Sequence, residues 1–318
     1  MQDIRASIAE EIAQVNELIS QSTRSNIDLV NTIGQYAIIQ PGRKMIRPMM
    51  IILFAKAIDY QDHSAIKLAA IIELIHSATL LHDDVIDHAN VRRNKATTHS
   101  VFGGTQSILM GDFIYAAAFG LIAALHSPDT TKILSDATRE IVEGEILQLS
   151  LTNNVKTSLD DYFRIIRAKT ALLFSTGALC INKLSNNTAV GNAISDYAFH
   201  FGMLYQITDD ILDIDIHNQD LNKAHGTDLR EGKMTLPTIL AYQHASPTDQ
   251  AMIEQVILGN AHWEDILPII TKTKAIEHCQ HYIQKHCQSA INALTNLPPS
   301  IFKDYLINLI KHIPTRKK

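Results

Sequence analysis

An apolar segment that ends in three aspartates limits the fold more than any other part of the sequence. Most of residues 70–81 are apolar, and Asp83, Asp84 and Asp87 follow almost directly. Side chains four residues apart lie on one face of a helix, so Asp83 and Asp87 point the same way and Asp84 flanks them. A helix that is apolar nearly all round is buried, which places the carboxylates at the mouth of an apolar interior. We expect a bound cation there.

The same spacing recurs at Asp209, Asp210 and Asp213. With ordinary aspartate content, chance produces two such DDxxD patterns in only about 0.2% of chains of this length. A solvated helix face is the alternative, and it would need polar neighbours. The neighbours are instead apolar, namely Ile207, Ile211, Leu212 and Ile214. Because carboxylates are rarely buried without partners, both sets indicate function.

The rest of the sequence is typical of helices. No alternation of apolar and polar residues persists long enough to build a sheet, and only 13 Gly and 9 Pro occur among the 318 residues. Composition shifts nowhere sharply enough to mark a linker. Long helices are expected over residues 64–87, 106–124 and 159–181, and from residue 194 to the second acidic set. The sequence therefore predicts one all-α domain over residues 1–318.

Charge and cysteine content exclude several classes of protein. A net charge of −5 and 6% aromatic residues argue against a nucleic-acid surface, so no nucleic-acid partner is expected. The three cysteines, Cys180, Cys279 and Cys287, are odd in number and unpatterned, which indicates neither a disulfide framework nor a zinc site. This cysteine usage fits a cytoplasmic location.

No membrane-spanning segment is expected. The N-terminus combines acidic residues with helical apolar spacing, which indicates one amphipathic helix and not a signal peptide. The apolar positions are Ile4, Ile8, Ile12 and Val15. Residues 108–125 form the most apolar run, but Asp112 interrupts them and no Lys or Arg flanks them. They are predicted to form a buried core helix.

Basic side chains accompany both acidic sets. One cluster directly precedes a helix that Pro48 can start, where the helix dipole favours anions, so the cluster makes sense as a phosphate site. Arg92 and Arg93 follow the first acidic set closely, and guanidinium groups match phosphate oxygens. Lys169 lies in an apolar stretch and needs an anionic partner. The other basic residues are Arg43, Lys44 and Arg47 in the first cluster and Lys223, Arg230 and Lys233 after the second set.

This combination of groups suits one kind of substrate. Carboxylates without accompanying Cys or paired His are hard oxygen ligands, which Mg²⁺ prefers, and Mg²⁺ commonly joins carboxylates to substrate phosphates. Metal ions and cationic side chains also stabilise the charge that develops as a C–O bond to a diphosphate breaks. Since the remaining walls are apolar, the expected substrate is an allylic diphosphate with a hydrocarbon tail.

Two other helical classes compete with this interpretation. A ferritin-like carboxylate-bridged metal protein needs Glu-x-x-His on two helices, whereas this sequence has the spacing once, at Glu73 and His76. Such a protein would also have no use for the Arg and Lys clusters. A helical interaction scaffold needs a repeat of fixed period, and none is evident.

The two aspartate motifs, LLHDDVID and YQITDDILD, resemble those of the trans-prenyltransferases, or polyprenyl diphosphate synthases. The segments GRKMIRP, RRNKATTH and GTDLREGKMTLP are also similar to family motifs and occur in the family's order. The resemblance implies a single large helical bundle around a deep central cavity, the isoprenoid synthase-like fold. It also implies that the allylic diphosphate ionises, that isopentenyl diphosphate attacks the cation, and that a proton is then lost.

The resemblance assigns roles to individual residues. It implies that three Mg²⁺ ions bind with the substrate, on Asp83, Asp84, Asp87, Asp209, Asp210 and Asp213. Contacts to the allylic diphosphate are implied for Arg92, Lys169, Thr170, Gln206, Lys223 and Lys233. Contacts to isopentenyl diphosphate are implied for Lys44, Arg47, His76 and Arg93. The catalytic set is Asp83, Asp84, Asp87, Lys169, Asp209, Asp210 and Lys233.

A long-chain product of about eight isoprene units (C40) is expected from the helix before the first motif. Family members with short products place a bulky aromatic residue four or five positions before the motif, where this sequence has Thr79 and Ala78. These positions, with Ile75 one turn further back, would line the pocket for the growing tail. Tyr115 and Phe119 share a helix face and would form a deeper floor, although core packing explains the pair equally well. The alternative is a shorter farnesyl or geranylgeranyl product.

The resemblance also implies partners for the chain. Family members pair through the region of residues 108–125, so a homodimer is expected. A long hydrocarbon product calls for transient membrane contact at its release, and its expected use is as a quinone side chain. Farnesyl diphosphate is the expected starter.

Overall fold

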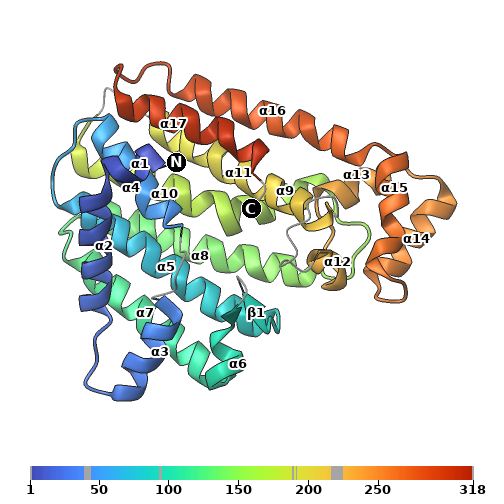
Figure 1. The fold of residues 1–318 in the computed structure, drawn as a ribbon, viewed down its shortest axis with the longest axis horizontal. Coiled ribbons are helices and arrows are strands. Elements are labelled where there is room, and N and C mark those ends of the chain that lie inside the picture. The colour runs from blue at the N-terminus through green and yellow to red at the C-terminus, as the bar shows by residue number, and fades with distance from the viewer. Residues whose placement is uncertain are drawn as a thin grey trace. The chain divides into compact units, whose positions relative to one another are not determined.

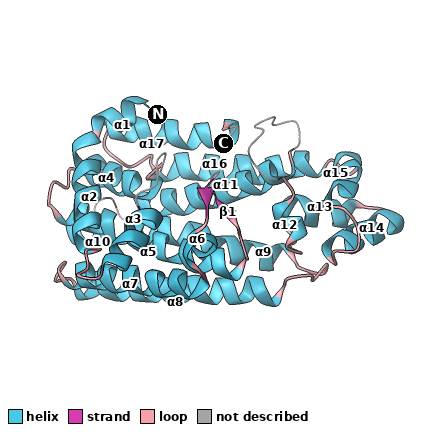
Figure 2. Cartoon of the chain, turned by 60° about the horizontal axis from the view of Figure 1, so that its bottom comes forward, coloured by secondary structure: helices cyan, strands magenta, loops and turns pink. Residues whose placement is uncertain are grey.

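The structure, a computed structural model, describes residues 2–38, 44–92, 95–187, 190, 192–215 and 225–316. The chain divides into two compact units. Unit 1 comprises residues 1–138, 176–195 and 296–306, and unit 2 comprises residues 139–175, 196–295 and 307–318. Helices make up nearly all of the secondary structure (Figure 2). The all-α prediction is confirmed, and the assignment of residues 1–318 to one domain stays a prediction.

Unit 1 contains the N-terminal helices and the first acidic set. Its elements are α1 (Gln2–Ser7), α2 (Ala9–Ser22), α3 (Asp28–Ile38), α4 (Ile46–Ala57), α5 (Ser64–Ile86), β1 (Val91–Arg92), β2 (Lys95–Ala96), α6 (Thr98–Phe102) and α7 (Gly104–Ala123) (Figure 1). Residues of both units occur in α8 (Pro128–Ser150), α10 (Leu172–Ser185), α11 (Ala193–Ile214) and α17 (Ile301–His312). The antiparallel pair of β1 and β2 is the only sheet in the described part of the chain.

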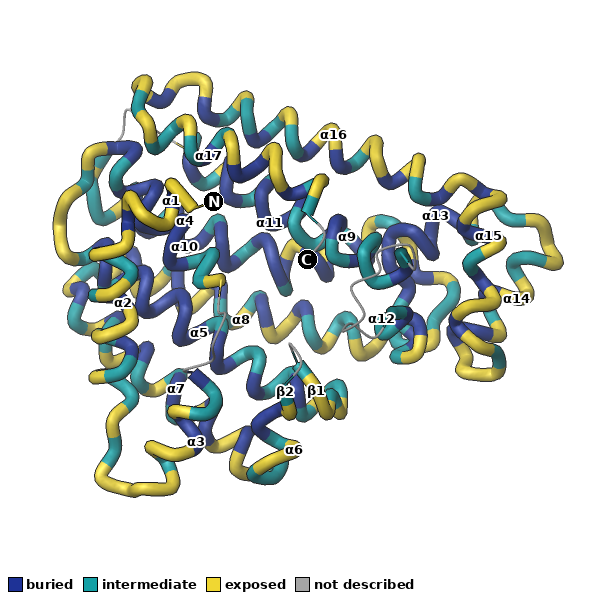
Figure 3. Tube along the Cα trace, in the orientation of Figure 1, coloured by how far each residue is buried: buried dark blue, intermediate teal, exposed yellow. Residues whose placement is uncertain are grey.

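The helix that carries the first acidic set is α5, and it is buried nearly all round. The sequence predicts a helix over residues 64–87, and the structure has it from Ser64 to Ile86 with Asp87 as its C-terminal cap. α5 packs against α2, α4 and α7, and its apolar residues between 65 and 78 are all buried, as the dark blue in Figure 3 shows. Burial of this apolar area stabilises the packing. α5 is therefore the core of unit 1 and presents aspartates at one end.

α7 buries one face only. Met110 and Ile114 are buried, whereas Leu109 and Phe119 are 62% and 54% exposed. The predicted burial of a helix at residues 108–125 is thus confirmed for one face of α7 and wrong for the other. Among the described helices, α5 and α7 are long and apolar enough to cross a membrane, with 72% and 33% of their apolar windows buried. This evidence is weak, because core helices of globular proteins can have the same length and composition.

The N-terminal segment forms two helices where the sequence predicts one. α1 and α2 are separated by Ile8, which leaves the helical conformation with φ −129° and ψ 19°. The predicted apolar positions still face the interior, since Ile4, Ile8 and Val15 are buried and Ile12 is half-buried. A break of one residue therefore divides the helix without changing the face that it buries.

Unit 2 contains the second acidic set, near the C-terminal end of α11. Its other elements are α9 (Leu159–Ile166), η1 (Arg167–Ala171), α12 (Thr227–Arg230), α13 (Leu236–His244), α14 (Pro247–Ile257), η2 (Trp263–Ile266), α15 (Leu267–Lys272), α16 (Ala275–Ala293) and η3 (Ile313–Thr315). The sequence predicts an uninterrupted helix over residues 159–181. The structure instead has a π-helical turn, η1, between α9 and α10. Such turns contain one extra residue and are frequent at functional sites.

Candidate active site

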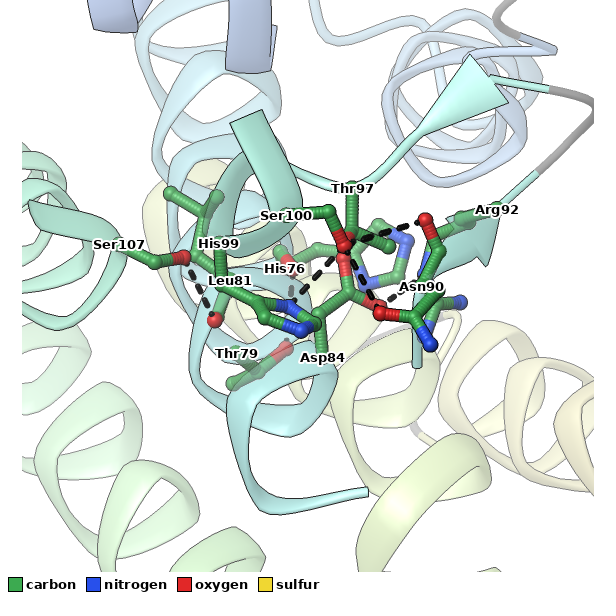
Figure 4. A network of polar contacts seen from close by, with 10 residues as sticks. All are labelled: His76, Thr79, Leu81, Asp84, Asn90, Arg92, Thr97, His99, Ser100 and Ser107. Carbon is green, nitrogen blue, oxygen red and sulfur yellow. Dashed lines mark hydrogen bonds and ion pairs between the residues drawn. The ribbon is translucent and has the colours of Figure 1, made fainter. Parts of the chain in front are cut away.

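The first acidic set lies at the C-terminal end of α5, and one of its members is already paired with a cation. Asp84 is 5% exposed, and its Oδ1 accepts a hydrogen bond from Arg92 Nε at 2.6 Å within an ion pair (Figure 4). Burial raises the pKa of Asp84, and the Arg92 guanidinium opposes that rise. Arg92 therefore supplies the cation that a buried carboxylate requires.

A network of short polar contacts holds the segment that carries Arg92. The carbonyl oxygen of Asn90 accepts hydrogen bonds from Thr97 N at 3.0 Å and from Ser100 Oγ at 3.3 Å. Thr97 Oγ1 lies 2.8 Å from Ser100 Oγ and 3.1 Å from His99 Nδ1. Figure 4 shows these residues gathered around Asp84. The loop after α5 is thus tied to the start of α6, which restricts the position of Arg92.

Asp83 and Asp87 are half-buried, in contrast to Asp84. Burial, and to a smaller extent the Asp83 carboxylate, raise the pKa of Tyr115 on α7 to about 12. The rings of Tyr115 and His82 lie 6.0 Å apart. Tyr115 therefore belongs to the surroundings of the first acidic set.

Two residues predicted to hold isopentenyl diphosphate are in direct contact. Arg47 Nη1 lies 3.0 Å from His76 Nε2 and joins the first turn of α4 to α5. Lys44 lies just before α4, and its carbonyl oxygen accepts a hydrogen bond from Arg5 Nη2 at 3.3 Å. The structure thus brings Arg47 and His76 together and places Lys44 beside the same helix end. Arg93, predicted for the same substrate, lies outside the described residues.

The positions predicted to line a chain-length pocket differ in exposure. Ala78 and Ile75 are 0% and 1% exposed, so neighbouring side chains cover both. Thr79 is half-buried, and its hydroxyl donates a hydrogen bond to a backbone oxygen of α5 at 2.9 Å. On α7, the rings of Tyr115 and Phe119 stack with centroids 6.2 Å apart. Thr79 is therefore the most accessible of the three α5 positions, and the pocket itself stays a prediction.

In unit 2, a chain of hydrogen bonds holds Asp210. Its Oδ2 accepts from Tyr162 Oη at 2.6 Å, and its Oδ1 accepts from Gln206 Nε2 at 2.7 Å. Gln206 Oε1 accepts in turn from Thr170 Oγ1 at 2.7 Å. Asp210 is 3% exposed, and burial is the main reason why its pKa rises well above the usual value. Side chains from α9, η1 and α11 thus fix both oxygens of this carboxylate.

A cavity of about 90 Å³ lies beside this hydrogen-bond chain. Charged and polar side chains in its walls include Tyr162, Lys169, Gln206, Asp210, Asp228 and Lys233. Lys169 Nζ lies 3.0 Å from Glu145 Oε2, which is the anionic partner that the sequence requires. Lys233 Nζ lies 2.6 Å from Glu231 Oε2. Two lysines and two carboxylates therefore line one polar cavity, while Lys223 lies outside the described residues.

Asp228 also lines the cavity, although no sequence motif singles it out. Burial raises the pKa of Asp228 to about 7, the nearby Asp213 adds to the rise, and Lys233 opposes it. The available signal was an acidic residue in the loop that carries the predicted lysines. The turn before it needs Gly226, because its φ of +67° is strained for other residues and a Cβ there would collide with Trp263.

Asp213, predicted as a metal ligand, holds the start of α12. Its Oδ1 accepts a hydrogen bond from Thr227 N at 3.2 Å, and its Oδ2 accepts one from Asp228 N at 3.1 Å. Its carbonyl oxygen accepts from Gly226 N at 2.7 Å. A carboxylate in this position satisfies backbone amides that a helix start leaves free. Asp213 thus has a structural use, and its role toward a metal stays a prediction.

Asp209 is paired with Arg316, an arginine outside the sequence motifs. Arg316 Nη2 lies 2.6 Å from Asp209 Oδ1 and donates to Tyr205 O at 3.0 Å. Its guanidinium carbon lies 3.8 Å from the centroid of the Tyr205 ring. No local pattern connects positions so far apart in the sequence, so this contact depends on the fold.

Two glycines allow helices to approach η1 closely. A Cβ on Gly202 of α11 would collide with the backbone of Ala171, and a Cβ on Gly144 of α8 would collide with Ala168. α8 and α11 therefore touch η1 without side chains between them at these points. The approach of α8 is what lets Glu145 reach the lysine of η1.

The donor chemistry of both acidic sets fits Mg²⁺. The candidate ligands are carboxylate oxygens, and Asp84, Asp210 and Asp228 have raised pKa values because they are buried. A bound divalent cation would offset the cost of keeping such groups charged. Within the described ranges, no three acidic, His or Cys side chains converge as a ready metal site. Arginines and backbone amides engage three of the aspartates instead.

The chain matches the model of the polyprenyl synthetase family over residues 27–271. That range contains both acidic sets, the π turn and the cavity beside Asp210. The chain therefore belongs to the polyprenyl synthetase family, and it is a prenyltransferase. The family resemblance, the fold class and the enzyme class predicted from the sequence are confirmed, and the ferritin-like alternative is wrong.

Particular relatives cover nearly the whole chain. The octaprenyl diphosphate synthase of Escherichia coli (strain K12) is 37% identical over 100% of this chain and 99% of that protein. A polyprenyl synthase structure from Caulobacter crescentus CB15, complexed with calcium and isoprenyl diphosphate, has a TM-score of 0.93 at 32% identity and covers 99% of this chain and 97% of its own. A decaprenyl diphosphate synthase structure from Rhodobacter capsulatus has the same TM-score at 31% identity, with 100% and 99% coverage.

Proposed function

We propose that this chain is a long-chain trans-polyprenyl diphosphate synthase, which adds isopentenyl diphosphate repeatedly to an allylic diphosphate. The observation that carries the proposal is the cavity beside Asp210, where two carboxylates and two lysines face the same space. Carboxylates suit Mg²⁺ and lysines suit diphosphate oxygens, so one site meets both parts of a metal diphosphate. Relatives named octaprenyl and decaprenyl diphosphate synthase support the long-chain class.

The residues of unit 2 would bind the allylic diphosphate. Lys169 and Lys233 are each paired with a glutamate, so they are positioned to donate to its oxygens. Tyr162 and Gln206 hold Asp210 in one orientation at the cavity wall. Asp209 and Asp210 would hold Mg²⁺ here, and a bound divalent cation makes a diphosphate a better leaving group. Within unit 1, Asp84 holds Arg92, which the family resemblance assigns to the allylic diphosphate.

The basic residues of unit 1 would bind isopentenyl diphosphate. Arg47 and His76 are in contact, and Lys44 lies beside the same end of α4. After ionisation, the isopentenyl double bond attacks the allylic cation, and the departing diphosphate accepts the proton that is lost. Exclusion of water by apolar walls protects the cation from hydrolysis.

We propose a C40 product grown from farnesyl diphosphate with three Mg²⁺ ions bound. The small side chains at positions 78 and 79 support a long product, because no aromatic ring blocks α5 four or five residues before Asp83. A shorter farnesyl or geranylgeranyl product is the alternative, and it would require a block from another element. The proposed use of the product is as a quinone side chain.

We also propose that the chain forms a homodimer through α7. The apolar side chains of Ile108, Leu109 and Phe119 are exposed in unit 1, and such patches are typical of association sites. Transient membrane contact during product release and a cytoplasmic location stay predictions.

The test is to incubate the purified protein with Mg²⁺, isopentenyl diphosphate and farnesyl diphosphate, and to size the products by chromatography. A ladder of chains that ends near C40 is expected. EDTA should abolish the products, because the carboxylates need the metal to hold the diphosphate. Absence of any elongated product under saturating substrates, with the protein folded by circular dichroism, would contradict the proposal.

A further inference from the structure

The side chain of Arg316 forms an ion pair with the carboxylate of Asp209. It follows η3 and is 12% exposed, with Nη2 at 2.6 Å from Asp209 Oδ1 and at 3.0 Å from Tyr205 O. The guanidinium group also stacks on the Tyr205 ring at 3.8 Å. Three separate interactions therefore place this one cation at the first carboxylate of the second acidic set.

The contact leaves part of the arginine unsatisfied. Arg316 Nε is buried and has no hydrogen-bond partner among the described residues. A guanidinium group carries five N–H donors in a planar fork, which matches two oxygens of a carboxylate or a phosphate. At Asp209 the group uses this fork only in part. An acceptor with more oxygens, such as a diphosphate, would satisfy it better.

We propose that Arg316 is a positioning residue that acts through Asp209: it neutralises this carboxylate until a metal diphosphate binds, and then transfers to the diphosphate oxygens. The inference rests on the proposed function, because it takes Asp209 as a ligand of Mg²⁺. A divalent cation and a guanidinium group repel each other and compete for the same oxygen. While Arg316 is paired with Oδ1, Asp209 is neutralised and binds metal weakly, and it becomes a full ligand when Arg316 leaves.

This competition sets an order of events at the second acidic set. Without diphosphate, Arg316 keeps Asp209 in a neutral pair beside the buried Asp210 and weakens metal binding at that position. A diphosphate supplies a new acceptor for the guanidinium group and brings additional ligand oxygens for the metal. The metal at Asp209 should therefore bind together with diphosphate and not before it.

The test is a titration of the full-length, substrate-free protein with Mn²⁺, followed by the electron paramagnetic resonance signal of the free ion. Arg316→Gln removes the competing charge and should bind Mn²⁺ about tenfold more tightly than the wild type, the effect of losing one charged hydrogen bond. Arg316→Lys keeps the charge and should restore much of the wild-type affinity. Arg164→Gln is the matched control, because Arg164 is an exposed arginine of unit 2 that pairs with Asp161 at 3.9 Å. It should leave the affinity unchanged.

Two further measurements separate competition from a merely structural ion pair. In an Asp209→Asn background, Arg316→Gln should change Mn²⁺ affinity much less, because the negative charge for which the two cations compete is gone. Inorganic diphosphate should remove the difference between wild type and Arg316→Gln. Equal Mn²⁺ affinities of wild type and Arg316→Gln without diphosphate would overturn the inference. If the wild type makes no elongated product, the proposed function fails, whereas the Mn²⁺ comparison still reports the competition at Asp209.

Discussion

Removal of the Tyr162 hydroxyl tests whether its hydrogen bond orients Asp210 for metal binding. Tyr162→Phe deletes one oxygen and keeps the ring, which packs edge to face against Phe163 with centroids 5.2 Å apart. Burial first and Asp210 second raise the pKa of Tyr162 well above the usual value, so the hydroxyl stays protonated and donates. The substitution therefore removes one of the two side-chain hydrogen bonds that hold Asp210.

The size of the effect follows from the burial of both groups. Tyr162 and Asp210 are each 3% exposed, and their oxygens lie 2.6 Å apart. A hydrogen bond to a charged group contributes about 1.5–3 kcal/mol, which corresponds to roughly 10- to 100-fold in an affinity or a rate. The lower end applies if a water from the adjacent cavity replaces the hydroxyl. We expect turnover to fall at low Mg²⁺ concentration. Loss of a group that hydrogen-bonds to a metal ligand lowers metal affinity by a similar factor.

The assay is the rate of isopentenyl incorporation as a function of Mg²⁺ concentration. Tyr242→Phe is the matched control, because its hydroxyl lies 2.7 Å from Glu254 Oε1 in the same unit but away from the cavity. The control should keep the wild-type Mg²⁺ dependence. If Tyr162→Phe also keeps it, with an unchanged maximal rate, the hydrogen bond does not orient Asp210 for metal binding and the reasoning fails.

Three further predictions concern other parts of the chain. Ala78→Tyr should shorten the product seen by chromatography, because its ring would block the path of the tail along α5; an active variant with the parental product would remove Ala78 from the pocket. Leu109→Glu should yield monomers in light scattering, because it places a charge on the exposed apolar face of α7, and unchanged dimers would exclude this face. Burial, together with the neighbouring His200, lowers the pKa of His286 to about 4, so the folded chain binds this proton less readily than the unfolded chain. The free energy of unfolding should therefore fall as the pH drops from about 6.5 to about 4, by up to about 3 kcal/mol, and urea titrations of His286→Gln should lack this component.

Much of the helical frame could be predicted from local patterns. The C-terminal end of α5 is predicted to within one residue, because the helix is apolar on all sides and the aspartates end its apolar run. The contact of Arg47 with His76 and the link from Thr170 to Gln206 join residues that motif resemblance had grouped. Local pattern and tertiary packing agree in these cases.

The remaining features depend on tertiary contacts that no local pattern encodes. The break at Ile8 changes one residue's conformation while the same face stays buried, so the apolar spacing could not reveal it. The pairing of Arg316 with Asp209 joins distant segments of unit 2. The use of Asp213 as a helix cap could not be predicted either, because DDxxD spacing says nothing of which backbone amides lie nearby.

The π turn determines which side chains of residues 162–174 face α11. Side chains twelve residues apart in a regular α-helix differ in direction by about 120°, and one inserted residue turns them back by about 100°. With η1 in place, three side chains of this segment meet α11 in succession: Tyr162 at Asp210, Thr170 at Gln206, and Phe174 at Phe201 with ring centroids 5.2 Å apart. The π turn thus absorbs one residue and keeps the side chains before and after it on the same face. Deleting one residue within 167–171 would close the turn and leave Tyr162 and Phe174 eleven positions apart in a regular helix, about 20° apart in direction. Both ends of the segment would then stay aligned with α11, and only the side chains of the turn itself, Lys169 and Thr170 among them, would shift.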